Sequence, residues 1–129
     1  MTKNSEQSII KYEIPFAPIT KKNSSRLVRA GGRSFILPSK AYSDYYSNCA
    51  LCFAKSRTVI DFPVNVKCTY YMPTRRKVDL VNLLEATCDV LVGYGILSDD
   101  NSQIVVSHDG SRVFYDKQRP RTEIAITKI

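Results

Sequence analysis

The residues best suited to chemistry lie between Asp79 and Asp100, in the stretch DLVNLLEATCDVLVGYGILSDD. A basic run of Arg75, Arg76 and Lys77 comes just before it. Carboxylate oxygens are the ligands that Mg²⁺ prefers, and neighbouring cations can hold a phosphate group. Together they favour hydrolysis of a phosphodiester backbone with the help of divalent metal ions.

An amphipathic helix over residues 80–93 would position these acids. Five apolar residues recur at helical spacing: Leu80, Leu83, Leu84, Cys88 and Leu91. At about 100° per residue, four polar residues fall within about one third of the circumference, opposite the leucines. They are Asp79, Asn82, Glu85 and Asp89. The helix therefore presents one polar, mainly acidic face.

The end of this helix predicts a reversal of the chain. Gly93 and Gly95 favour a C-terminal break. We expect the reversal to bring Asp99 and Asp100 back beside the strand end that leads into Asp79. Crowded carboxylates repel one another unless a cation joins them, so this arrangement predicts a metal site.

Each acidic residue also has an ordinary structural explanation. Asp79 is a natural N-cap for a helix beginning at Leu80. Glu85 and Asp89 could form a solvated helix face, and residues 99–102 could form a polar turn. The acids occur together behind a basic run, however, and that combination favours the metal site.

Charge points to a polyanionic partner. The chain has 129 residues, a formal net charge of +7 and a pI of about 9.3. Such a balance favours neutralisation of phosphates and release of their counterions. Between Thr20 and Lys40 there are cations and no acid. The candidate DNA-binding residues are Lys21, Lys22, Arg26, Arg29, Arg33, Arg75, Arg76 and Lys77.

The remaining patterns predict a single α+β domain over residues 8–129, after a flexible tail of residues 1–7. A hairpin is expected over 26–37, with its turn at 30–32, and a second helix over 38–55. Further strands are expected over 8–16, 63–72, 103–107, 112–116 and 122–128. We expect a mixed β-sheet with the two helices packed on one face.

Other features narrow the class of protein. The N-terminus is polar and no apolar run reaches the length of a membrane span, so we expect a cytoplasmic protein without membrane attachment. Cys49 and Cys52 form a CxxC pair with no second pair at zinc-finger spacing. We expect them to be buried free thiols rather than a zinc or redox site.

The segment RRKVDLVNLLEATCDVLVGYGILSDDNSQI resembles the RusA family of Holliday-junction resolvases. The family pattern is a basic run, D-x-D-N-L-x-K, an apolar helix ending in D-x-L, a glycine and an acidic pair. The earlier PFAPITKKNS resembles the family's opening strand and basic loop. The resemblance implies a RusA-like fold of prophage type. It also implies a Mg²⁺-dependent endodeoxyribonuclease, with Mn²⁺ as an alternative, that acts as a homodimer on four-way DNA junctions in recombination and repair.

The family's site residues can be carried over by position. Asp79 matches the first metal-binding aspartate, Asp100 matches the aspartate that completes the site, and Asn82 matches the asparagine at the helix start. Two positions depart from the pattern. Val81 replaces the second aspartate, and Glu85 replaces the catalytic lysine.

We hypothesise that the two departures compensate, because Glu85 restores a carboxylate. The proposed catalytic residues are then Asp79, Glu85 and Asp100. Asp99 joins them as a metal ligand, and Asn82 and Asp89 support the site. The electrostatic role of the lost lysine would pass to Arg76 or Lys77.

Two other functions stay open from the sequence. The first is a catalytically inactive or weakened, structure-selective DNA-binding protein with the same fold. The second is an RNA-binding module that stacks bases on Tyr70, Tyr71 and Tyr115. No motif assigns a role to Asp109, Arg112 or Glu123, and His108 is expected in a turn.

Overall fold

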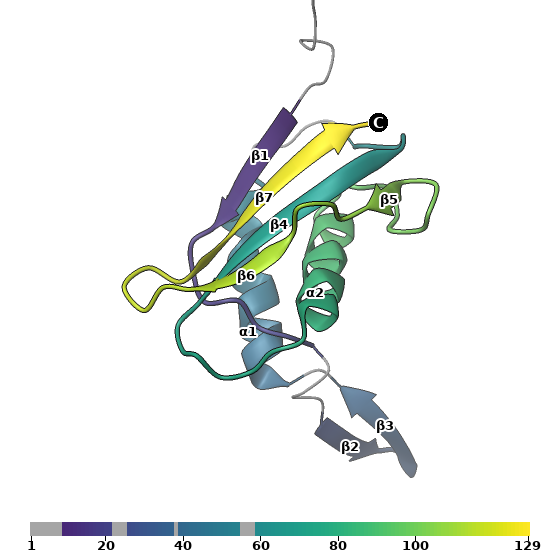
Figure 1. Cartoon of the computed structure of the whole chain (residues 1–129). Helices are drawn as coiled ribbons and strands as arrows, with labels where there is room; N and C mark the ends of the chain where they lie inside the picture. Colours follow the sequence, from purple (N-terminus) through teal and green to yellow (C-terminus); the bar gives the residue numbers. More distant parts are fainter. Residues whose placement is uncertain (1–8, 22–25, 38, 55–58) are drawn as a thin grey trace, which may run out of the picture.

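A computed structural model of the chain describes residues 9–21, 26–37, 39–54 and 59–129 (Figure 1). The predicted tail of residues 1–7 lies outside these ranges. The described elements are β1 (Ile9–Ile14), β2 (Arg26–Ala30), β3 (Arg33–Leu37), α1 (Lys40–Asn48), β4 (Val64–Met72), α2 (Leu80–Gly93), β5 (Val105–Ser107), β6 (Arg112–Tyr115) and β7 (Arg121–Lys128).

The main sheet is built around β4. On one side β4 pairs antiparallel with β7, which in turn pairs antiparallel with β1. On its other side β4 pairs in parallel with β5 near its beginning and with β6 near its end. The predicted turn at 108–111 therefore joins two strands that lie one after the other along β4. The prediction of a mixed sheet is confirmed.

Both helices lie on the same face of this sheet (Figure 1), as predicted. Alternate residues of β4 are buried on that side: Val64, Val66, Cys68 and Tyr70. They pack with the buried face of α2, which includes Leu83 and Leu91, in one hydrophobic core. No described helix covers the opposite face of the sheet (Figure 1), where Lys11, Glu13, Lys67 and Glu123 line a hollow.

The helix bounds were predicted with unequal success. α2 spans Leu80–Gly93 as predicted. α1 is shorter than predicted, since it ends at Asn48 and the chain tightens into a 3₁₀ turn over Cys49–Cys52. Ser39 caps α1, because its Oγ accepts a hydrogen bond of 3.0 Å from the backbone N–H of Tyr42. In the described ranges, neither helix has the length and apolarity needed to cross a membrane.

The predicted hairpin of β2 and β3 extends away from the sheet and the helices (Figure 1). We call residues 26–37 the basic arm. Gly31 and Gly32 form its turn with φ of +61° and +75°, a left-handed conformation that favours glycine. Arg29 and Arg33 are exposed on the arm.

Candidate metal centre and nucleic-acid interface

Asp79 occupies the N-cap position of α2 without using its side chain as a cap. Its backbone carbonyl accepts the first helical hydrogen bond, from the N–H of Leu83 at 3.1 Å. Its carboxylate makes no capping bond among the described residues. Within the described ranges, the side-chain amide of Asn82 alone donates a hydrogen bond to it, at 3.4 Å. An exposed carboxylate at a helix N-terminus is therefore left for another partner.

The chain leaves α2 in a tight turn. Gly95 has φ of +77°, and the N–H groups of Ile96 and Leu97 both donate to the carbonyl of Leu91. Leu97 then forms an isolated parallel bridge with Ile60. These bonds hold the start of the connection near the C-terminal end of α2.

Asp99 and Asp100 have different environments in this connection. The two Asp99 oxygens accept hydrogen bonds from the backbone N–H of Asp100 at 2.7 Å and from the side chain of Asn101 at 3.0 Å. Asp99 thus shapes the turn. The Asp100 side chain is exposed and accepts no hydrogen bond in the described part of the chain. Of the pair, Asp100 is the one whose oxygens are uncommitted.

The prediction that one chain brings Asp79 and Asp100 together is wrong. Asp79 ends the loop that follows β4, whereas Asp100 precedes β5, which pairs with the beginning of β4. The two connections lie at opposite ends of α2 (Figure 1). The fourteen residues of α2 rise about 21 Å, while carboxylates sharing one Mg²⁺ must approach within about 4 Å. In the ranges that the structure covers, no three His, Cys, Asp or Glu side chains are grouped to hold a metal ion.

The charge of Asp100 reaches the last turns of α2. Burial raises the pKa of the Cys88 thiol to about 12, and the negative charge of Asp100 adds to the shift, so Asp100 lies near this part of α2. Glu85 is exposed and precedes the buried Cys88 by about one helical turn.

Val81 occupies an open position on the first turn of α2. Its side chain is 73% exposed, although it is branched and aliphatic. The described core makes no use of it. A carboxylate at this position would be exposed two residues after Asp79, with its oxygens free to bind a cation.

Asp89 is committed to packing between elements. Tyr42 donates its hydroxyl hydrogen to Asp89 Oδ2 at 2.6 Å, and Lys21 Nζ lies 3.5 Å from Asp89 Oδ1. Burial raises the pKa of Tyr42, and the hydrogen bond to Asp89 raises it further, so Tyr42 stays a donor. Lys21 lies before the basic arm and Tyr42 lies after it. Asp89 therefore joins α2 to the chain on both sides of the arm, a contact that we call the Asp89 clamp.

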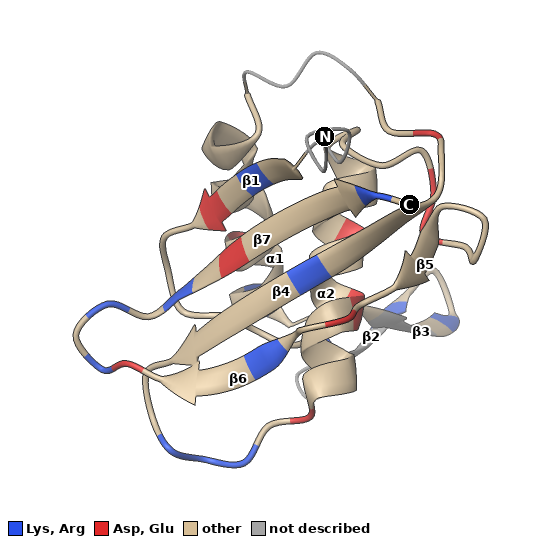
Figure 2. Cartoon of the chain, turned by 45° about the horizontal axis from the view of Figure 1, so that its top comes forward, with Lys and Arg blue, Asp and Glu red and all other residues tan. Residues whose placement is uncertain are grey.

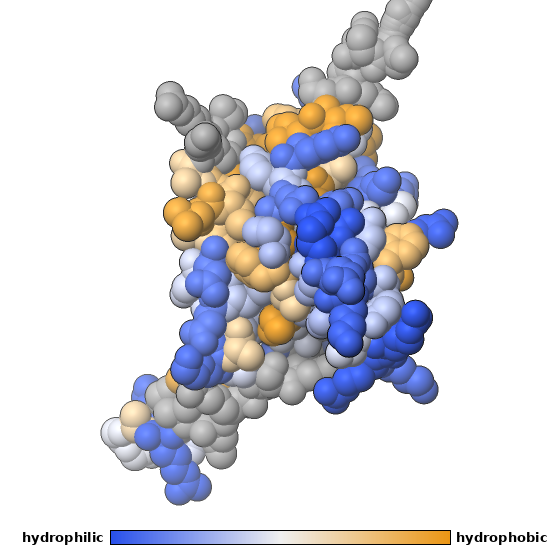
Figure 3. All heavy atoms as spheres, turned by 90° about the vertical axis from the view of Figure 1, so that its left-hand side faces the viewer, coloured by the Kyte–Doolittle hydropathy of each residue, from blue (hydrophilic) through white to orange (hydrophobic). Residues whose placement is uncertain are grey.

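The basic residues beside the acids line a surface hollow. Arg76 and Lys77 border a hollow of about 270 Å³, together with Thr20 and other residues of the 18–20 segment. Figure 2 shows Lys and Arg in the 73–79 loop and on the basic arm, and Figure 3 shows hydrophilic side chains over much of one side. The basic run and the 18–20 segment thus share one surface. Lys22 and the side chain of Arg26 lie outside the described residues.

A comparison with protein families identifies the family of this chain. A family model described as endodeoxyribonuclease RusA matches residues 15–127. The chain belongs to the RusA family. Membership implies endodeoxyribonuclease activity on Holliday junctions. The match includes the basic arm, both ends of α2 and the strands β4 to β7. A comparison with curated proteins found no match.

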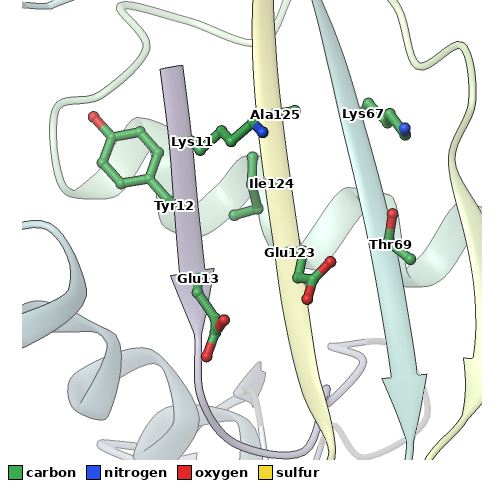
Figure 4. Close-up of a pocket in the computed structure, with 8 residues that line it drawn as sticks. All are labelled: Lys11, Tyr12, Glu13, Lys67, Thr69, Glu123, Ile124 and Ala125. Atoms are coloured by element: carbon green, nitrogen blue, oxygen red, sulfur yellow. The ribbon is translucent and has the colours of Figure 1, made fainter. Parts of the chain in front are cut away.

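A second hollow of this RusA-family chain lies on the open face of the sheet (Figure 4). It measures about 390 Å³ and is lined by residues of β1, β4 and β7. Glu13 and Glu123 face each other there across paired strands. Arg119 pairs with Glu13 at 3.0 Å and Arg121 pairs with Glu123 at 2.9 Å. Because arginines already balance both carboxylates, this hollow is a weaker metal candidate than α2.

The stacking platform of the RNA-binding alternative is incomplete in this RusA-family chain. Tyr70 is 1% exposed, and its hydroxyl is 2.6 Å from Thr87 Oγ1 in the core. Tyr71 stacks on Phe114, and Arg121 lies 3.7 Å from its ring centroid. Arg75 lies 4.1 Å from the ring centroid of Tyr115, so all three predicted tyrosines already have partners.

The remaining residues of interest have structural contacts. His108 Nδ1 lies 2.8 Å from the carbonyl of Val66, within the predicted turn. The backbone of Asp109 bonds to the side chain of Asn65. These contacts fasten the 108–111 turn to β4.

The cysteines of the RusA-family chain are free thiols. Cys49, Cys68 and Cys88 are buried, whereas Cys52 is partly exposed. Burial raises the pKa of Cys49 and of Cys68 to about 12. The three buried thiols therefore stay protonated near neutral pH.

Sequence reasoning missed Tyr42. This residue and Asp89 are 47 positions apart, and no pattern within either helix relates them. Only the packing of α1 against α2 reveals the contact.

Proposed function

We propose that this chain is a divalent-metal-dependent endonuclease that cleaves four-way DNA junctions as a homodimer. One observation carries the proposal within a RusA-family chain: α2 has an exposed, uncommitted carboxylate at its beginning and another just after its end. These are Asp79 and Asp100. Among the described residues, Asp79 has a 3.4 Å contact from the Asn82 amide and the Asp100 side chain accepts no hydrogen bond.

Oxygen-rich, exposed side chains fit a hard divalent cation. Asp79, Glu85 and Asp100 would hold it, with Asp99 shaping the turn that presents Asp100. A bound divalent cation would supply Lewis-acid stabilisation of the charge that develops on the phosphate. Arg76 and Lys77 would hold the phosphate beside Asp79 and offset its charge.

A homodimer follows from the length of α2. Since one chain holds Asp79 and Asp100 too far apart to share a metal ion, each would need a carboxylate from elsewhere. A second copy related by a two-fold axis, with its α2 antiparallel to the first, would bring Asp79 of one copy toward Asp100 of the other. Two equivalent sites would result, which suits the cutting of two opposed strands.

Cleavage of a synthetic four-way junction tests this function. With Mg²⁺ or Mn²⁺, we expect wild type to cut the junction and Asp100→Asn to lose at least about 100-fold in rate, since a ligand is removed. Asp44→Asn is the matched control, because Asp44 is an exposed partner of Lys40 on α1. Full activity in Asp100→Asn would contradict the proposed site. Full activity in Glu85→Gln would exclude Glu85 from the proposed site and leave Asp79 and Asp100 in it.

One observation favours a second candidate, a DNA-binding protein without catalysis. Val81 stands where the family has an aspartate, and it is exposed without a packing role. A binder of this kind would hold the junction with a steep salt dependence. It would show no nicking with either metal ion, so the same cleavage assay separates the two functions.

A further inference from the structure

The two helices run side by side in the same direction. Near the start of α1, the Tyr42 hydroxyl bonds to Asp89 of α2 and lies 3.5 Å from the carbonyl oxygen of Ala86. One turn further along α1, the Tyr46 ring stacks on Tyr94, just past the end of α2, with centroids 5.0 Å apart. Because both contacts advance together along the chain, the start of α1 lies opposite the middle of α2. The basic arm precedes α1 and extends from the end of the molecule where both helices begin (Figure 1).

One carboxylate holds the chain on both sides of the arm. Lys21 is the last described residue before the arm, and Tyr42 lies in the first turn of α1 after it. Lys21 Nζ approaches Asp89 Oδ1 at 3.5 Å, whereas the Tyr42 hydroxyl donates to Oδ2 at 2.6 Å. The Asp89 clamp thus uses one oxygen for each side. Val90 and Leu91, which follow Asp89, are fully buried, so this carboxylate is attached to a part of α2 that is fixed in the core.

Other contacts hold α1 against α2 independently of the clamp. A Cβ at Gly93 would overlap the Tyr46 hydroxyl, so the missing side chain lets the two helices approach closely. The Tyr94 hydroxyl donates to the carbonyl of Tyr46 at 2.6 Å. By contrast, the Lys21 and Asp89 side chains are 40% and 38% exposed, beside a hollow of about 310 Å³. Loss of the clamp should therefore leave the packing of the two helices in place.

We propose that Asp89 is a positioning residue, which fixes the direction of the basic arm relative to the Asp79 end of α2. The arm has three arginines and no acidic residue. The inference rests on the proposed function, because a fixed direction is useful only if the arm meets the junction. Asp89 itself would touch neither metal ion nor DNA. Without the clamp the arm would sample more directions, and binding would have to order it at a cost in free energy.

The direction of the arm can be measured without DNA. Nitroxide labels on p-acetylphenylalanine, at Ser34 of the arm and at Lys117 after β6, avoid the native cysteines, and both positions are exposed. In the otherwise wild-type chain we expect a narrow distance distribution by pulsed electron paramagnetic resonance. Asp89→Ala should broaden it, because both sides of the arm lose their attachment to α2. Tyr42→Phe keeps the buried ring and should broaden it less, so it tests the clamp even if Asp89→Ala does not fold.

Thr87→Val is the matched control for a loss of stability. It also removes a hydrogen bond from α2, but the partner of Thr87 is Tyr70 in the core, so the distance distribution should stay that of wild type. Binding of a fluorescein-labelled four-way junction is then measured without divalent metal. We expect Asp89→Ala to bind about 3- to 10-fold more weakly than Thr87→Val, because the arm must be ordered on binding. A purely structural role of Asp89 would affect the two variants alike.

The outcomes separate this inference from the proposed function. Equal distance distributions in Asp89→Ala, Tyr42→Phe and Thr87→Val would overturn the inference, as would equal junction affinities of Asp89→Ala and Thr87→Val. In either case, junction cleavage by wild type leaves the proposed function standing. If wild type does not bind the junction, the proposed function is overturned, and the distances still decide whether Asp89 fixes the arm.

Discussion

At the scale of residues, the acids of α2 divide into those with a structural task and those without one. Asp89 holds the clamp and Asp99 shapes a turn. Asp79 and Asp100 have exposed carboxylates with little else to bind. The sequence predicted which acids belong to the helix and its ends. It could not predict which of these acids have structural contacts, because the partners of Asp89 come from segments distant along the chain.

Val81→Asp should strengthen the site. It restores a carboxylate at an exposed position on the first turn of α2, where negative charge is also favourable to the helix. We expect the Mg²⁺ concentration for half-maximal junction cleavage to fall several-fold, with stability unchanged within about 0.5 kcal/mol. Val81→Asn is the uncharged control. An unchanged Mg²⁺ requirement would argue against a ligand position here.

Asp89→Ala should lower stability without changing the requirement for metal. It removes the acceptor of the Tyr42 hydroxyl and the partner of Lys21, at a cost of about 1–2 kcal/mol in the free energy of unfolding by urea. Asp44→Ala, which breaks an exposed pair, should cost less than about 0.5 kcal/mol. A large rise in the Mg²⁺ needed for cleavage would instead identify Asp89 as a ligand.

At the scale of elements, periodicity predicted what is local. It located α2 and β4, since each buries one face at a constant spacing. It overextended α1, which ends at Asn48. It gave no partner for β5 and β6, because strand pairing depends on segments far apart in the chain.

The interface of β4 and α2 includes one buried polar pair. Thr87→Val keeps the side-chain shape but leaves the Tyr70 hydroxyl without its 2.6 Å partner. Since an unsatisfied buried hydroxyl costs about 1–3 kcal/mol, the free energy of unfolding should fall by that amount. Adding Tyr70→Phe should recover part of the loss, as a double-mutant cycle measures. Additive losses would show that the pair is not coupled.

At the scale of the whole molecule, the proposed metal site requires a second chain, because its acids lie at the two ends of α2. The sequence predicted that the glycines after α2 would fold the acidic pair back toward Asp79. Instead the turn is held by Leu91 and Ile60, and β5 continues along the beginning of β4. A pattern in one chain shows which residues are available. It does not show whether one copy or two supply them.

A mixture of Asp79→Asn and Asp100→Asn proteins tests the account most directly. In an exchanged dimer, the intact Asp100 of one chain would meet the intact Asp79 of the other and rebuild one site. With Mg²⁺ and a four-way junction, we predict cleavage by wild type, none by either variant alone, and nicking of single strands by the mixture. If wild type cleaves the junction but the mixture does not, although its chains exchange between dimers, the shared site is contradicted. If wild type itself does not cleave the junction, the proposed nuclease activity is contradicted.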